Sequence, residues 1–163
     1  METKERLRIA DEVWIATALL HRENPEAADF SIDQIVARVA RLNGAEELRP
    51  GVYVHAVQHC VANRPPNPGR YCMLFESSAG RRRLFRKGDA FHPAREGAKI
   101  TPEPENIPVP HQKLLLWYRE WSEQAAAGTA KSDPLLRLKG SGKKLWADEP
   151  ADVYVERLRE GWQ

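Results

Sequence analysis

The sequence predicts an α+β fold of the winged helix-turn-helix class: three helices and a β-hairpin wing, with a covering helix and an extended C-terminal arm. The prediction rests on three signals that follow one another between residues 30 and 88. A capped amphipathic helix comes first, then a helix opened by a proline, then a hairpin whose turn is rich in arginine. In a fold of this class the second of these helices and the hairpin are the elements placed against DNA.

The first two helices are predicted from apolar periodicity and from their ends. Residues 4–22 repeat apolar side chains at steps of three and four, namely Ile9, Val13, Ala16 and Leu20, and Asn24-Pro25 ends the helix. Ser31 and Gln34 form a capping box for a second helix, and Gly44 stands where a left-handed cap is expected. Its apolar face is predicted to contain Ile32, Ile35, Val36, Val39 and Leu42.

A third helix and a hairpin are predicted next. Pro50 suits a first helical turn, and the run RPPNPG over residues 64–69 halts the helix. Periodicity directs Val54, Val57 and Val61 to the core and the polar side chains to the opposite face. Tyr71–Glu76 and Arg82–Arg86 are predicted to be strands around a turn at residues 77–80.

The chain divides into four predicted parts, of which the winged-helix domain of residues 1–98 is the first. Residues 99–124 contain a proline-rich strap and a covering helix over His111–Gln124, with Leu114, Trp117, Tyr118 and Trp121 on one side. Residues 125–132, AAAGTAKS, are expected to be a flexible linker, and residues 133–163 a partner-binding tail.

Positive charge is concentrated in one segment. Residues 64–99 carry 9 basic and 3 acidic side chains, a net of +6, whereas residues 1–63 carry 7 basic and 10 acidic side chains, a net of −3. Such a segment attracts phosphate. The residues expected to contact double-stranded DNA are His55, Gln58, His59, Asn63, Arg81, Arg82, Arg83, Arg86 and Lys87. The alternative is a domain used for protein contacts, with a solvated hairpin.

Catalytic and metal-binding patterns are incomplete. His55 and His59 have the spacing of a zinc protease, but Ala56 stands where the glutamate would be. The stretch from Gly140 to Lys143 resembles a phosphate-binding loop only superficially. We therefore expect no enzyme activity, cofactor or metal. Two cysteines and the absence of a long apolar run predict a cytoplasmic protein without a membrane span.

Two parts of the chain resemble known families. Residues 7–121 resemble a little-characterised bacterial family of winged-helix type, through the strings HCVANRPPNPGRY, RRLFRKGDAFHP, KITPEPENIP and LLLWY. Residues 133–162 resemble the toxin-binding C-terminus of antitoxins that neutralise PIN-domain ribonucleases, with a leucine-rich start, a glycine turn, an acidic patch and the ending R-x-R-E-x-W. This second resemblance implies an antitoxin-type, DNA-binding regulator with a PIN-domain toxin as its partner.

The composition of the tail is consistent with partner binding. Tyr154, Leu158 and Trp162 fall on one stripe of a short helix, in a segment too polar to build its own core. The residues expected to bind the partner are Leu145, Trp146, Tyr154, Arg157, Leu158, Arg159 and Trp162. Alternatives are a tail that docks on its own domain, and a protein-interaction or DNA-targeting module without a toxin partner. A homodimer is a further option.

Overall fold

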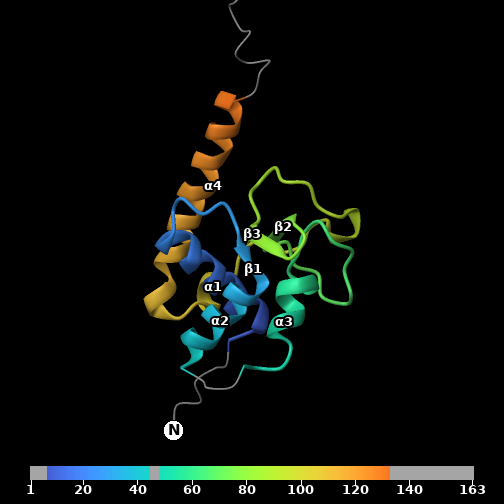
Figure 1. The fold of residues 1–163 in the computed structure, drawn as a ribbon, viewed down its shortest axis with the longest axis vertical. Coiled ribbons are helices and arrows are strands. Elements are labelled where there is room, and N and C mark those ends of the chain that lie inside the picture. Colours follow the sequence, from blue (N-terminus) through green and yellow to red (C-terminus); the bar gives the residue numbers. More distant parts are fainter. Residues whose placement is uncertain (1–6, 45–47, 133–163) are drawn as a thin grey trace, which may run out of the picture. The chain divides into compact units, whose positions relative to one another are not determined.

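The computed structural model describes residues 7–44 and 48–132 and shows a mixed α+β arrangement (Figure 1). The described helices are α1 (Ile9–Glu23), α2 (Ile32–Asn43), α3 (Val52–Val54), which continues as a π-helix over His55–His59, and α4 (Lys113–Ser132). The described strands are β1 (Phe30–Ser31), β2 (Leu74–Ser78) and β3 (Arg81–Leu84). The first compact unit of the chain ends at Glu123.

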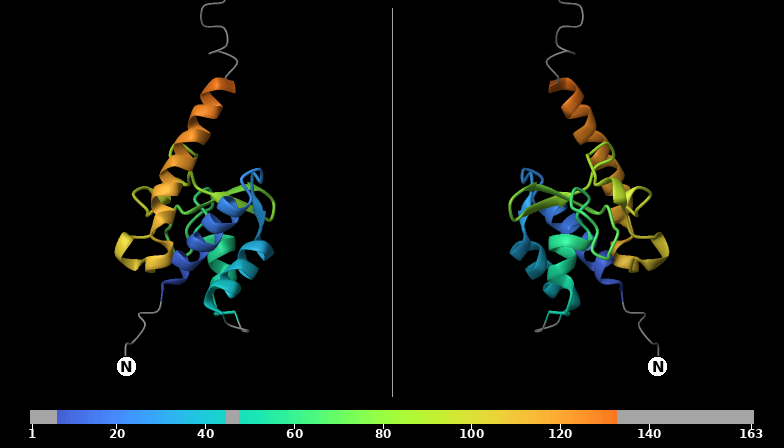
Figure 2. Two further views of the ribbon diagram at one scale, coloured as in Figure 1. Left: turned by 90° about the vertical axis from the view of Figure 1, so that its left-hand side faces the viewer. Right: turned by 90° about the vertical axis from the view of Figure 1, so that its right-hand side faces the viewer.

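Helix α1 is the centre of the core. Every residue from Ala10 to Leu19 is buried, because α1 contacts α2, the π-helix and β3. Figure 2 shows α1 between α2 and the first turns of α4, and the Trp14 ring meets the Tyr118 ring edge-on with centroids 5.6 Å apart. The helix ends at Glu23 with Asn24 as its cap, as predicted, but it begins at Ile9, so the described residues 7 and 8 lie outside it.

The predicted cap of α2 is confirmed. The backbone N–H of Ser31 donates to Gln34 Oε1 at 2.8 Å, and the backbone N–H of Gln34 donates to Ser31 Oγ at 3.2 Å. Gly44 closes the helix with φ 58°, a left-handed conformation that costs glycine little. Ile35 and Val39 are fully buried on the expected face.

The third helix differs from its prediction. It ends at His59 instead of Asn63, and its last five residues have the wider π-helical turn. This turn brings positions 52, 56 and 60 onto one side, so Val52, Ala56 and Cys60 face the core and Val54 is 45% exposed. The prediction that Val54 faces the core is therefore wrong. Val61 is buried, but it lies beyond the helix, where it forms an isolated bridge with Leu74.

The sheet is antiparallel in the order β1-β3-β2. Strands β2 and β3 are shorter than predicted and meet at a tight turn, Ala79-Gly80, in which Gly80 has φ 72°. Strand β1 was not predicted from the sequence, because two residues are too few to show an alternating pattern. It places Phe30 in the core and pairs it with Arg82 across the ladder.

The segment after the hairpin is a covering strap and a helix. Residues 99–110 contain short 3₁₀ turns and no α-helix, as predicted. Helix α4 buries Leu114 and Tyr118, but it continues to Ser132. Residues 125–132, predicted to be a flexible linker, are helical in the structure, in keeping with the helix propensity of their alanines, which outweighs the cost of Gly128.

Two further predictions concern membrane spans and the C-terminal tail. None of the described helices is long and apolar enough to cross a membrane. The predicted partner-binding tail, residues 133–163, lies outside the described residues.

Candidate functional site

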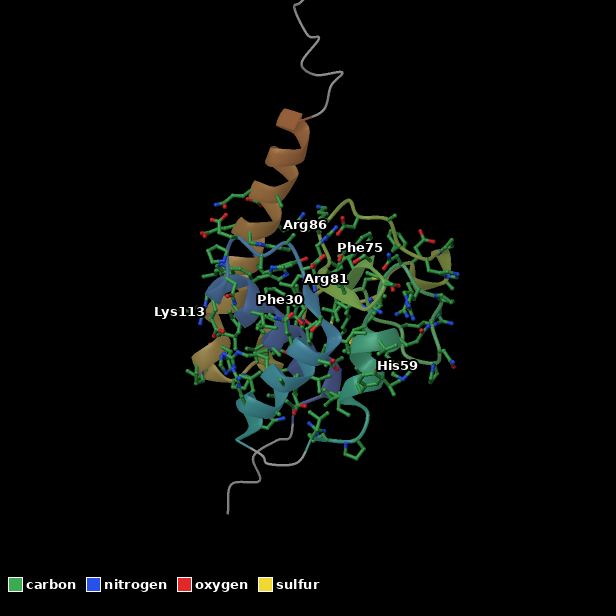
Figure 3. All side chains as sticks on the ribbon, in the orientation of Figure 1. Phe30, His59, Phe75, Arg81, Arg86 and Lys113 are labelled. Carbon is green, nitrogen blue, oxygen red and sulfur yellow. The ribbon has the colours of Figure 1, made fainter. Side chains whose placement is uncertain are left out.

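The structure brings the third helix and the hairpin together, as the DNA-binding prediction requires. Arg82 of β3 lies against the carboxyl end of this helix, and His59 and Arg81 mark the helix and the hairpin in Figure 3. Whether these elements present a binding surface depends on where their polar side chains point.

Arg82 points inward. Only 1% of it is exposed, its Nε donates to the carbonyl oxygen of Ala56 at 3.2 Å, and Nη2 donates to that of Val57 at 3.4 Å. Glu76 forms an ion pair with Nη1 at 3.2 Å. Burial lowers the pKa of Arg82 and the Glu76 carboxylate opposes that change. The prediction of Arg82 as a DNA contact is corrected: it caps the helix, whose last carbonyl groups have no partners within the helix.

Arg95 completes the same cap, and no sequence pattern predicted this role. It is 1% exposed, and its Nη2 and Nη1 donate to the carbonyl oxygens of Gln58 at 2.7 Å and His59 at 2.8 Å. Further bonds from Nε and Nη1 reach the carbonyls of Arg64 at 2.6 Å and Tyr71 at 2.7 Å. Two arginines therefore satisfy four consecutive carbonyl groups and fix the loop that follows the helix.

Two other hairpin arginines are neutralised by carboxylates. Arg81 Nε lies 2.5 Å from Asp29 Oδ1, and Ser77 Oγ donates to the same carboxylate at 2.6 Å. The Ser77 hydroxyl and Arg81 together hold the pKa of Asp29 below its usual value. Arg83 forms a bidentate pair with Asp89 at 2.6 and 2.8 Å. The positive charge of this segment is thus largely engaged within the domain.

The polar side chains expected to read bases are engaged in the same way. His55 Nδ1 lies 2.9 Å from the carbonyl oxygen of Gly51, and Gln58 donates to the carbonyl of Pro65. The Asn63 side chain makes two bonds, of 2.9 and 3.0 Å, to the backbone of Glu76.

His59 is held in place by packing. Its ring centroid lies 4.8 Å from that of His55, and a Cβ on Gly69 would come within 2.8 Å of His59 Cβ, so the loop fits closely over the ring. Burial, with help from neighbouring His55 and Arg95, lowers the pKa of His59. His59 therefore fixes the helix against its loop.

Apolar side chains face outward from the third helix. Tyr53 is 54% exposed and Val54 is 45% exposed. Of the predicted DNA contacts within the described chain, Lys87 is exposed without an ion pair, and Arg86 packs on Trp121 with 4.6 Å between its guanidinium carbon and the ring centroid. This outward face can bury apolar surface against a partner.

The two cysteines, Asp89 and His92 are buried or bonded to backbone groups. Cys60 and Cys72 are buried free thiols whose pKa is raised by burial. Asp89 accepts a bond from the backbone N–H of Arg86 at 2.7 Å, and His92 accepts one from that of Ala94 at 3.2 Å. No group of three or more metal-ligating side chains occurs in the part of the chain that the structure describes.

Comparison with known proteins adds no relative. No protein-family model, no curated protein and no solved structure matches this chain. The two resemblances described from the sequence therefore remain predictions.

Proposed function

We propose that this chain is a protein-binding module with a winged-helix arrangement, and that its C-terminal segment is an antitoxin-like arm. The order α1, β1, α2, α3, β2, β3, with the sheet order β1-β3-β2, supports this arrangement. Helices α2 and α3 contact each other, as the two helices of a helix-turn-helix must.

One observation carries the choice of a protein partner over DNA. The third helix presents Tyr53 and Val54 outward, while most of the side chains expected to meet bases and phosphates are bonded within the domain. Binding to DNA gains its free energy mainly from cations that release counterions from phosphates. Aromatic and aliphatic side chains that lose solvent contact are instead the main source of affinity between proteins.

The proposed role of the arm comes from its sequence. Residues 133–162 resemble antitoxin tails, so a PIN-domain ribonuclease is the proposed partner and its neutralisation the proposed effect. Large apolar side chains in this segment, Trp146, Tyr154, Leu158 and Trp162, are the proposed anchors.

DNA binding is the second candidate, as in an antitoxin that regulates its own operon. The contact between α2 and α3 favours it, and so does the side chain of Arg81, which is 45% exposed beside Asp29. A phosphate could compete with Asp29 for that guanidinium.

The test is a titration of the full chain with fluorescent duplexes, including its own promoter, at low and physiological salt. The proposal predicts no salt-dependent binding, and it predicts co-purification with a PIN-domain protein encoded by the neighbouring reading frame. Tight binding that weakens steeply with salt, and that is lost in Arg81→Ala, would favour the DNA candidate instead. Replacing Arg82 together with Arg81 would be a poor test, because Arg82 is buried and supports the core.

A further inference from the structure

We propose that Asn43, the last residue of α2, deamidates spontaneously and that its products alter the connection between α2 and α3. Asparagine is a thermolabile residue, and deamidation is fastest when glycine follows it, because glycine puts no side chain beside the attacking atom. Asn43 precedes Gly44 and is the one asparagine of the chain with that neighbour. The inference goes beyond the proposed function and does not depend on it.

The reaction needs only water and involves no oxidation or reduction. The backbone nitrogen of Gly44 loses its proton and attacks Cγ of Asn43, so a new C–N bond closes a succinimide ring. The bond from Cγ to Nδ2 breaks, and Nδ2 leaves as ammonia. Water then opens the ring at either carbonyl carbon. Opening at Cγ gives aspartate, whereas opening at the backbone carbon gives isoaspartate, in which the chain runs through the former side chain.

The structure leaves both reacting groups accessible. Asn43 and Gly44 are exposed, and a Cβ added to Gly44 would meet no atom within 4 Å. The Asn43 side chain forms no hydrogen bond with another described residue. Gly44 has left the helical conformation, with φ 58°, and its N–H donates a long bond of 3.4 Å to the carbonyl oxygen of Arg41. Helix ends fray, which frees the backbone of Asn43 to rotate towards ring closure.

The other four asparagines lack these conditions. Asn24 and Asn67 precede proline, whose nitrogen carries no proton to lose. The side chain of Asn63 is held by two bonds, of 2.9 and 3.0 Å, to the backbone of β2. Asn106 precedes Ile107, a β-branched residue that is only 2% exposed. The chain therefore contains its own controls for the reaction at Asn43.

Both products should weaken the carboxyl end of α2. A carboxylate there lies at the negative end of the helix dipole. Isoaspartate also adds one atom to the backbone before Gly44, which displaces the N–H that bonds to Arg41. Helices α2 and α3 contact each other and are joined through residues 44–51, so the change acts on the helix that presents Tyr53 and Val54.

The experiment incubates the full chain at body temperature over a series of mildly alkaline pH values and analyses its peptides by mass spectrometry. The peptide that contains Asn43 should gain the mass difference between an amide and an acid. It should separate into two products, one of which protein isoaspartyl methyltransferase labels. The rate should rise about tenfold for each pH unit, as the deprotonated fraction of the backbone nitrogen does. Peptides that contain Asn63 or Asn106 should stay unmodified over the same time.

Two variants separate the reaction from its consequence. Asn43→Gln should suppress the modification, because its longer side chain must close a larger ring that forms more slowly. Asn43→Asp supplies the charge without the altered backbone. Incubation should lower the unfolding temperature of the wild type and leave that of Asn43→Gln unchanged. Fresh Asn43→Asp should show a smaller shift than the incubated wild type.

Two results would overturn the inference. Modification of Asn43 no faster than that of Asn63 or Asn106 would show that it is not the site. Complete modification at Asn43 without a change in the unfolding temperature would show that the connection between α2 and α3 is not affected. The mass measurement uses the wild-type chain, so it decides even if a variant does not fold, and neither result bears on the proposed protein partner.

Discussion

Arg82 and Arg95 lie in the interior because the third helix ends there. The carbonyl groups of residues 56 to 59 lie at the end of the helix, where no further helical turn supplies donors, and guanidinium groups donate to all four of them. A guanidinium carries five donors in one plane and can serve several carbonyl groups at once. Charge that looked like a DNA contact in the sequence therefore stabilises the fold.

Replacing Arg82 with alanine should lower the free energy of unfolding by about 2 to 4 kcal/mol, because two buried carbonyl groups lose their donors. Urea denaturation measures the change. Lys87→Ala, at an exposed position without an ion pair, is the control and should stay within about 0.5 kcal/mol. Equal effects of the two changes would mean that Arg82 is not a cap.

His21 should make stability depend on pH. Burial, then Arg86 and Arg83, lower its pKa from 6.5 to about 4, and its neutral Nε2 accepts a bond from the Leu84 N–H at 3.3 Å. Between these two pKa values the unfolded chain binds the extra proton, so stability is complete above pH 6.5 and falls as the pH drops towards 4. The loss should be on the order of 3 kcal/mol.

His21→Gln should remove this contribution of His21 to the pH dependence of the free energy of unfolding. Unfolding by urea at a series of pH values, in wild type and variant, isolates the contribution of His21 because all other groups are shared. If both proteins lose stability equally over this range, His21 is not the cause.

At the scale of elements, local signals were predicted well and long-range ones were not. The Ser31–Gln34 capping box and the Gly44 cap depend on residues within one or two turns, so the sequence alone predicted them. The end of the third helix depends on Cys60, whose carbonyl oxygen accepts bonds from the N–H groups of Met73 and Leu74. Such a contact with the strand region cannot be read from helical periodicity.

In the candidate site, too, local features could be predicted from the sequence and long-range contacts could not. The sequence shows by strand alternation alone that Arg81 and Arg83 face away from Arg82. It did not predict that Arg82 is on the buried side, because that depends on β3 packing against the helix. Strand β1, which covers the other edge of β3, was likewise too short to predict.

Substitutions of two valines test which side of the third helix faces the core. Val52→Ala should cost about 2 kcal/mol because Val52 is fully buried, whereas Val54→Ser should cost within about 0.5 kcal/mol because Val54 faces solvent. Thermal or urea unfolding measures both. A larger loss of stability from Val54→Ser than from Val52→Ala would mean that Val54 faces the core, as predicted from the sequence.

At the scale of the whole molecule, the net charge of a segment differs from the number of its cations that are free to contact a phosphate. The segment 64–99 has a net charge of +6, yet Arg82 and Arg95 are buried, and Arg81 and Arg83 are paired. Counterion release needs cations that reach phosphates. Few of these cations are therefore free to reach a phosphate, which is why we propose a protein partner rather than DNA.

The domain and the arm should be separable. Ending the chain after Ser132 should leave the unfolding temperature of the domain unchanged, since the first compact unit ends at Glu123. The same change should abolish rescue from the proposed PIN-domain toxin in cells. Growth assays and circular dichroism measure the two effects. Rescue by the shortened chain would show that the arm is not the toxin-binding segment.

The most direct test of the central claim places a photo-crosslinker, p-benzoylphenylalanine, at position 53 in cells. Tyr53 is exposed on the outward face of the third helix, and Leu116 of α4, also exposed, is the control position. The proposed function predicts an adduct from position 53 that protease digests and nuclease does not, that is weaker from position 116, and that Val54→Asp abolishes. An adduct that nuclease digests, or none at all from position 53, would contradict it.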